Sequence, residues 1–179
     1  MLVPHRGEVE IIQLWVNLPA KLKMVQPNYQ GFQKEAIPTF TDQDGHVKVN
    51  VMAGQYKGFT GPIQSLTGVS AYTIELVKGG KVHFEEKSDR NVLLYQLNGQ
   101  SNVNGTQTGD ATMLVFDQDG ESVHIEALTD GLLLLVSGNP IDEPMKSWGP
   151  YVMNTQTEIM EAMRDYQMGK MGKMGILID

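Results

Sequence analysis

The chain contains no cysteine among its 179 residues, and it has few basic residues and no long apolar run. The missing cysteine excludes disulfides, thiolate metal ligands and a cysteine nucleophile, and it suits a reducing compartment. The longest uninterrupted apolar stretch runs from Leu132 to Val136, whereas a membrane-spanning helix needs about 20 apolar residues. The N-terminus lacks an apolar core followed by a small-residue cleavage site, so we expect no signal peptide. These absences predict a cytoplasmic protein without a membrane partner.

Acidic residues outnumber basic ones, with 21 Asp and Glu against 14 Lys and Arg, which gives a net charge of −7. A surface of this charge repels phosphate backbones, so we expect no nucleic-acid partner. Several catalytic motifs are also missing from the sequence. These are the GxSxG nucleophile elbow, the GxGxxG phosphate loop, the GxxxxGKS/T phosphate loop and the HExxH zinc helix. The sequence therefore gives no support to the common hydrolase and nucleotide-binding classes.

Glycine is frequent, with 19 residues, and it falls in turn sequences such as DQDG, KGG and NG. Gly, Asn and Asp accept the backbone conformations that tight turns need. Between the turns lie short runs rich in β-branched and aromatic residues, at 8–17, 47–52, 71–77, 92–97, 112–116, 122–127 and 132–137. Short strands at this spacing predict an all-β sandwich or barrel. The run at 132–136 does not alternate, which predicts a strand covered on both faces.

Two predicted strands carry the histidines that could bind a metal. Alternation divides these strands into inward apolar residues, Val82, Phe84, Val123 and Ile125, and outward polar residues, His83, Glu85 and His124. The outward set contains the best local candidates for metal ligands, but it faces away from the predicted interior. His46 follows Gly45 in a turn. Because histidine metal sites need several converging ligands, we expect no metal, no cofactor and no catalytic residue.

One helix is predicted near the C-terminus, in the sequence NTQTEIMEAMRDYQMGK. Thr155 and Glu158 have the spacing of a capping box, and Gly169 is placed to end the helix. An apolar stripe at three- and four-residue spacing follows, formed by Ile159, Met163 and Tyr166 with Met160 beside it. This stripe is typical of a docking face.

Several stretches together resemble the pirin family. QLWVNLP at 13–19 and PNYQ at 27–30 are similar to the bridge between the two pirin domains, and GFTGPI at 58–63 is similar to the turn into the second one. The most specific part is the ending: GNP at 138–140, EP at 143–144, GPYVMNT at 149–155, EI at 158–159 and DYQMGKMG at 165–172. These pieces occur in the family's order over 13–172.

The resemblance implies a cupin fold, a double-stranded β-helix or jelly-roll barrel. Pirins have two such barrels, and the first carries a metal held by three His and one Glu. This sequence matches the bridge and the second barrel only, so the metal-binding barrel is expected to be absent. We expect an N-terminal strand and irregular bridge over 1–46, a cupin barrel over 47–150, a C-terminal helix over 151–172 and a tail over 173–179.

The cupin metal motif supports the expectation of a metal-free barrel. Counting back from Gly99 places Val92 where the motif has its glutamate. Counting from Gly120 places Val123 at the later histidine position, one residue before His124, and a one-residue slip reverses the side chain's face.

A fragment near the N-terminus also resembles the first pirin barrel. His5-Arg6-Gly7 matches the second half of a His-Pro-His-Arg-Gly-like strand that contributes to the pirin metal site. Two explanations stay open: coincidence in a leader before the bridge, or loss of most of the first barrel between Gly7 and Glu8. In either case a single histidine cannot hold a metal alone.

The sequence leaves three functions open. The first is a non-enzymatic interaction or regulatory module, as a homodimer or in complex with a separately encoded cupin half. The second is a quercetinase-like dioxygenase that uses iron or another divalent metal at a site completed by another chain. The third is a metal-free barrel that binds a small molecule in a cavity. Against this third function, we expect aromatic residues to fill the core and to leave no such cavity. Those aromatic residues are Tyr72, Phe84, Tyr95 and Phe116.

Overall fold

The structure is a computed structural model that describes residues 11–172. Within it the chain forms two compact units. One unit spans Met24–Asp142 and contains both large sheets. The other combines residues 11–23 with residues 143–172 and contains a hairpin and a helix.

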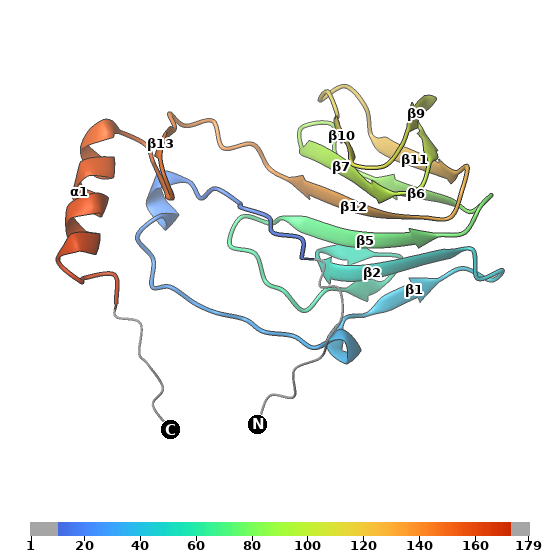
Figure 1. The fold of residues 1–179 in the computed structure, drawn as a ribbon, viewed down its shortest axis with the longest axis horizontal. Coiled ribbons are helices and arrows are strands. Elements are labelled where there is room, and N and C mark those ends of the chain that lie inside the picture. Colours follow the sequence, from blue (N-terminus) through green and yellow to red (C-terminus); the bar gives the residue numbers. More distant parts are fainter. Residues whose placement is uncertain (1–10, 173–179) are drawn as a thin grey trace. The chain divides into compact units, whose positions relative to one another are not determined.

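The larger unit is built on a six-stranded antiparallel sheet in the order β1-β2-β5-β12-β7-β10 (Figure 1). Its strands are β1 (Thr39–Thr41), β2 (Val47–Ala53), β5 (Ser70–Leu76), β7 (Asn91–Asn98), β10 (Thr112–Val115) and β12 (Gly131–Gly138). β12 lies at the centre and pairs with β5 on one side and β7 on the other. Residues Leu133–Ser137 of β12 are all buried, which confirms the prediction of a strand covered on both faces.

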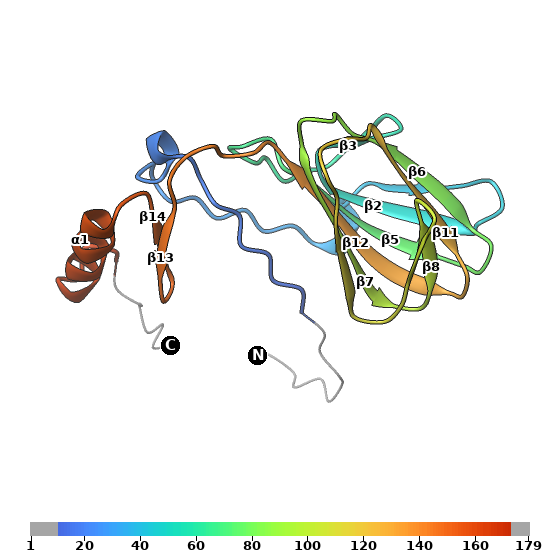
Figure 2. The same ribbon diagram turned by 90° about the horizontal axis from the view of Figure 1, so that it is seen from above.

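A second sheet faces the first (Figure 2). It has four strands in the order β6-β11-β8-β9. They are β6 (Lys81–Glu85), β8 (Ser101–Val103), β9 (Thr106–Thr108) and β11 (Ser122–Ala127). β6 is therefore an edge strand with one neighbour. The inward residues of both sheets form one apolar core. The cupin jelly-roll fold is confirmed, as two facing sheets rather than a closed barrel.

A short hairpin of β3 (Gln55–Tyr56) and β4 (Phe59–Thr60) follows β2, and a 3₁₀ turn, η2 (Lys34–Ala36), precedes β1. The hairpin turn is Lys57-Gly58, with φ of 45° and 86°. Two successive positive φ values are typical of a type I′ turn, whose twist matches that of the flanking strands. The turn brings Tyr56 into the core, where it is 7% exposed.

The strands predicted from 47 onward are all present. The strand predicted over 8–17 is wrong for residues 11–17, which have no regular structure, and residues 8–10 lie outside the described range. An isolated extended segment cannot complete its backbone hydrogen bonds, and residues 11–17 have no pairing strand within the described residues. β1 was missed, because it lies in the stretch predicted to be an irregular bridge.

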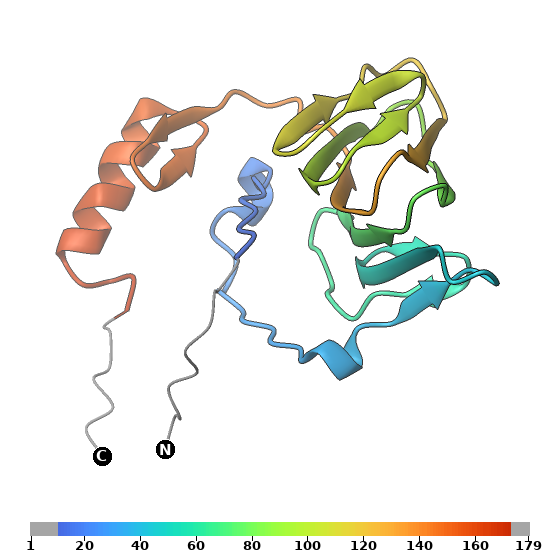
Figure 3. The ribbon, with the colours of Figure 1, turned by 45° about the vertical axis from the view of Figure 1, so that its right-hand side comes forward.

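The smaller unit contains a 3₁₀ turn, η1 (Ala20–Leu22), a hairpin of β13 (Lys146–Trp148) and β14 (Tyr151–Met153), and helix α1 (Gln156–Gln167). The helix lies against both strands of the hairpin (Figure 3). The backbone N–H of Ala20 and the side chain of Asn154 both donate to Glu143 Oε2, at 2.6 Å and 3.0 Å. Glu143 thereby connects the two chain segments of this unit.

Helix α1 has the capping residues predicted for it, but it is shorter than the predicted range 151–172, because residues 151–153 form β14. Thr155 and Glu158 form the capping box in both directions. At the other end Gly169 has a φ of 72°, and the N–H groups of Gly169 and Lys170 donate to the carbonyls of Tyr166 and Asp165. These two bonds form a Schellman motif.

The predicted apolar stripe of α1 is divided between two environments. Ile159 is buried and Met163 is half-buried, whereas Met160 and Tyr166 are exposed.

None of the helices within residues 11–172 has the length and hydropathy that a bilayer crossing requires.

Gly99 is a sensitive point of the larger unit. It has a φ of 83°, and an added Cβ would lie 2.3 Å from the carbonyl oxygen of Asp130. Gly105 has a similar φ of 88° but open space around it. Gly105→Ala should therefore lower the free energy of unfolding only by the conformational penalty, about 1–2 kcal/mol. Gly99→Ala should lower it by at least about 3 kcal/mol, because the backbone at Asp130 must also move.

Urea unfolding followed by far-UV circular dichroism measures this difference. Both tryptophans, Trp15 and Trp148, lie in the smaller unit, so their fluorescence does not report on the sheets. Equal losses of stability in the two variants would show that the contact with Asp130 does not constrain the fold.

Candidate functional site

The sequence candidates for metal ligands lie together on the outer face of the four-stranded sheet. His83 of β6 is the direct partner of His124 of β11, and Glu85 is paired with Ser122. The imidazole centroids are 5.9 Å apart, with ring planes 22° from parallel. All three candidates are exposed, while their neighbours Val82, Phe84, Val123 and Ile125 are buried. The predicted division of the two faces is confirmed.

These residues do not fit the metal site of a cupin barrel. Such a site needs three or more ligands that converge inside the barrel. Among residues 11–172 no three His, Asp or Glu side chains are grouped closely enough to hold an ion. His46 is exposed in its turn, and His5 lies outside the described residues. The metal-free state of this chain stays a prediction, and no reaction step can be assigned to a cupin metal.

Aromatic side chains fill the part of the core between the β3–β4 hairpin and β6. Phe84 lies 4.6 Å from Tyr56 and 5.2 Å from Tyr72, measured between ring centroids. Of the aromatic residues expected in the core, Tyr72 and Phe84 are buried and Phe116 is packed against the core while partly exposed. Tyr95 is different. It alternates with the buried Leu94 and Gln96, so its side chain lies on the outer face of the sheet.

Burial alters the acidity of two tyrosines. Desolvation, with a smaller contribution from Tyr72, raises the pKa of Tyr56 to about 12. Desolvation also raises the pKa of Tyr72, and the nearby Glu86 carboxylate acts in the same direction. Both phenols are therefore neutral at physiological pH. The Tyr72 hydroxyl donates to the carbonyl of Gln55 at 2.9 Å, whereas the buried Tyr56 hydroxyl has no hydrogen-bond partner among residues 11–172.

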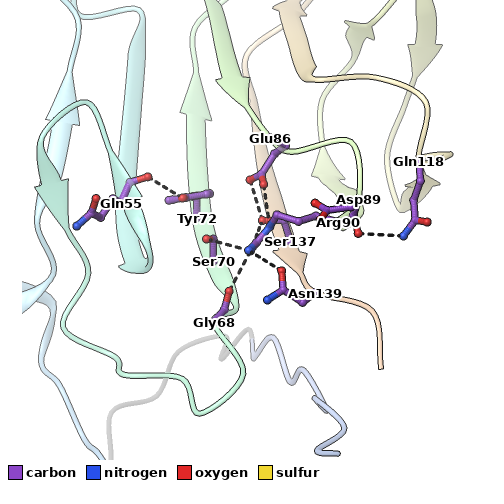
Figure 4. Close-up of polar contacts among 10 residues, drawn as sticks. All are labelled: Gln55, Gly68, Ser70, Tyr72, Glu86, Asp89, Arg90, Gln118, Ser137 and Asn139. Atoms are coloured by element: carbon purple, nitrogen blue, oxygen red, sulfur yellow. Dashed lines mark hydrogen bonds and ion pairs between the residues drawn. The ribbon is translucent and has the colours of Figure 1, made fainter. Parts of the chain in front are cut away.

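A nearly buried ion pair lies next to Tyr72. Arg90 Nε is 3.1 Å from Glu86 Oε2, and the side chains of Arg90 and Glu86 are only 14% and 10% exposed. The contact is an ion pair without an aligned hydrogen bond at Nε. Ser137 Oγ donates to Glu86 Oε1 at 2.7 Å and accepts from Arg90 at 3.1 Å (Figure 4). The serine hydroxyl thus joins the anion to the cation.

The other guanidinium contacts of Arg90 reach three more residues. One terminal nitrogen donates to the carbonyl of Gly68 at 3.0 Å and lies 3.5 Å from Ser70 Oγ, and the other donates to Asn139 at 3.3 Å (Figure 4). These residues come from the start of β5 and the segment after β12, while Glu86 and Arg90 come from the β6–β7 connection. We name the set Glu86, Arg90 and Ser137 the polar clamp. Its residues belong to the β6–β7 connection and to β12, and the contacts of Arg90 with Gly68 and Ser70 add the beginning of β5 as a third segment.

A cavity of about 310 Å³ lies between the β3 turn and β6. Its lining residues are Gln55, Tyr56, Lys57, Tyr72, His83, Phe84, Glu85 and Glu86. The volume is at the lower end of the range for small-molecule sites. The lining offers aromatic surface and neutral phenols, and the Glu86 carboxylate is already engaged by the polar clamp. This cavity contains no paired nucleophile and base.

Sequence reasoning missed the polar clamp. Glu86 and Arg90 do have the spacing of an ion pair on a helix, but the segment between β6 and β7 is a loop. The position of Ser137 within a buried apolar strand was the one available signal, because a buried hydroxyl needs a partner.

Comparisons with known proteins agree with this fold. The model of the pirin C-terminal cupin domain matches residues 71–172. The chain belongs to the pirin family. A pirin-like protein of Caulobacter vibrioides is 40% identical over 92% of this chain and 60% of its own length. A pirin-like protein of Solanum lycopersicum is 33% identical over 93% of this chain and 58% of its own length.

A solved structure is also similar. The crystal structure of quercetin 2,3-dioxygenase from Acinetobacter baumannii matches 90% of this chain and 56% of its own chain, with a TM-score of 0.85 and 31% identity. The chain thus spans about 60% of the length of the curated pirin relatives named above. The predicted resemblance to the C-terminal pirin domain is confirmed.

The polar clamp should contribute strongly to stability. Arg90→Met leaves the Glu86 carboxylate buried without its cation, which should cost about 3–5 kcal/mol. The matched control is Lys81→Met, which breaks the exposed ion pair between Lys81 and Glu126 and should cost less than about 1 kcal/mol. Urea unfolding monitored by far-UV circular dichroism compares the two. Similar values for both variants would refute a structural role for the clamp.

Proposed function

We propose that this chain is a non-enzymatic, regulatory interaction domain whose partner is a second cupin barrel of the kind found in the first half of pirins. The observation that carries the proposal is apolar surface exposed at the β10 edge of the six-stranded sheet, on a chain that spans about 60% of the length of its pirin relatives. The second barrel can belong to the same polypeptide or to another one. The proposal concerns the surface that receives it.

The apolar face lies on the outer side of the six-stranded sheet. In register across β12, β7 and β10, one row contains Leu134, Tyr95 and Met113, and the next contains Val136, Leu93 and Val115. Along each row the exposure rises from β12 to β10: Leu134 and Val136 are buried, Tyr95 and Leu93 are half-buried, and Met113 and Val115 are 60% and 72% exposed. Contiguous apolar residues on a sheet face mark interaction sites in soluble proteins. We name these two rows the outer apolar rows.

The smaller unit has its own exposed apolar residues. Trp148 of β13 and Met160 and Tyr166 of α1 are all more than half exposed. Aromatic residues and Met are enriched at protein interfaces. The pirin resemblance implies that the segment around α1 serves packing between barrels, and this exposure supports the same role here.

A charge placed in the outer apolar rows should weaken association. We expect the chain to dimerise, or to bind a purified first pirin barrel, at micromolar concentration. Val115→Glu should weaken this binding at least about tenfold, because a buried charge at an apolar interface costs more than about 1.4 kcal/mol. Thr106→Glu, on the exposed edge strand β9, is the control. Light scattering coupled to gel filtration measures both.

Two results would contradict the interaction proposal. One is a monomer that binds no first pirin barrel at tens of micromolar. The other is equal weakening by Val115→Glu and Thr106→Glu, which would place the interface elsewhere.

A dioxygenase is the second candidate, and the name of the Acinetobacter baumannii relative favours it. Such an activity would need metal ligands supplied by another barrel, since the described residues do not form a cupin metal site. We expect this chain alone, supplied with Fe²⁺ and oxygen, not to consume quercetin. Absorbance of quercetin with parallel oxygen measurement tests this. Turnover by the isolated chain that stops on addition of a chelator would establish the enzyme instead.

A further inference from the structure

The outward histidines of the four-stranded sheet form a geometric pair that the sequence did not reveal. His83 and His124 are directly opposite each other on neighbouring antiparallel strands. Their rings are stacked, with centroids 5.9 Å apart. Both strands are held by regular pairing, and β11 has a strand on each side. The pairing of the two strands therefore holds the two side chains next to each other.

This spacing suits a chelated metal ion. Two metal–nitrogen bonds of about 2.0–2.1 Å at a near-tetrahedral angle place the nitrogens roughly 3.3 Å apart. The ring nitrogens can approach each other more closely than the centroids do, and a change of χ1 and χ2 in the two exposed side chains can bring one nitrogen of each ring to that separation. No backbone movement is needed. Since both residues are exposed, ring rotation meets little resistance.

The surroundings favour a cation and leave room for its water ligands. A shallow groove of about 240 Å³ includes both histidines and is also lined by Lys81, Asn102, Asn104 and Glu126. Lys81 is paired with Glu126 at 3.1 Å, so its positive charge is compensated. Glu85 follows His83 by two residues on the same face, which leaves the local charge negative.

Polar atoms also lie directly beside His124. Ser122 Oγ is 3.1 Å from His124 Nε2, and Asn104 Oδ1 accepts the backbone N–H of His124 at 2.8 Å. An ion bound at Nε2 would replace the hydrogen bond to Ser122 and find the hydroxyl oxygen nearby. The pair thus offers two nitrogen ligands with oxygen atoms around them.

We propose that His83 and His124 form a two-histidine surface site for a divalent transition-metal ion of the nickel, copper and zinc class. Imidazole nitrogens prefer these ions to magnesium or calcium. Water completes the coordination, because no third His, Asp or Glu is grouped with the pair in the described residues. The site lies on the outside of the sheet, so it is distinct from a cupin metal centre. It is also independent of the association proposed above.

Isothermal titration of the metal-free protein with NiCl₂ tests the site. We expect one ion per chain, and a loss of affinity of at least about tenfold in both His83→Ala and His124→Ala, since removal of a direct ligand should cost no less than removal of an outer one. The double variant should be no worse than either single variant, because one histidine alone is not a chelate. His46→Ala, an exposed histidine in a turn, should bind as the unmodified chain does.

Thermal unfolding gives a second measurement. Because the ion joins β6 to β11 in the folded state only, a saturating excess of NiCl₂ should raise the melting temperature by a few degrees, on the order of 2–8 °C. The rise should vanish in the double variant, and MgCl₂ should produce none. Circular dichroism of the metal-free variants checks that they fold.

Several outcomes would overturn the site. These are the absence of nickel binding at millimolar concentration, full binding in the double variant, or loss of binding in His46→Ala alone. Failure of the association proposal would leave these results unchanged, since the titration needs no partner. Quercetin consumption is measured separately, so nickel binding without turnover supports the surface site and does not support a dioxygenase.

Discussion

The burial of alternate residues in β6 and β11 is the constraint on which the rest of the larger unit depends. Val82, Phe84, Val123 and Ile125 close the core from the side of the four-stranded sheet. Apolar burial contributes roughly 1.5–3 kcal/mol per side chain, so reversing either strand would expose several of them at once. With these faces fixed, the histidines between them must lie outside. The same constraint that removes His83 and His124 from the interior places both on the outer face, and the register between β6 and β11 sets them opposite each other.

The interior depends on polar compensation as much as on apolar burial. Glu86 and Arg90 are charged and nearly buried, which is tolerable only because Ser137 and the neighbouring backbone complete their contacts. The carboxylate has little freedom left for chemistry, and the adjacent Tyr72 is a neutral hydrogen-bond donor already in use. This end of the sandwich is built for rigidity.

Much of this structure could be predicted because its signals are local. Alternation in SVHIEAL and KVHFEE, the capping box at Thr155 and the unbroken run in β12 each reflect hydrogen bonding or burial within a few residues. The rest depends on contacts between distant segments. The segment 11–17 has strand-forming residues but no pairing strand within the described part of the chain, so the strand predicted there from its residue types was wrong. The polar clamp joins Arg90 to Ser137, and the histidine pair depends on the register between β6 and β11; neither is written in any short stretch of sequence.

The position of β6 at the edge of its sheet has a consequence for solubility. An edge strand offers unpaired backbone groups to another molecule, and uninterrupted β-sheet growth by this route leads to aggregation. The outward side chains of β6 are Lys81, His83 and Glu85, and charged side chains, lysine above all, are among the devices by which edge strands resist such addition. The strand therefore discourages fibril-like addition.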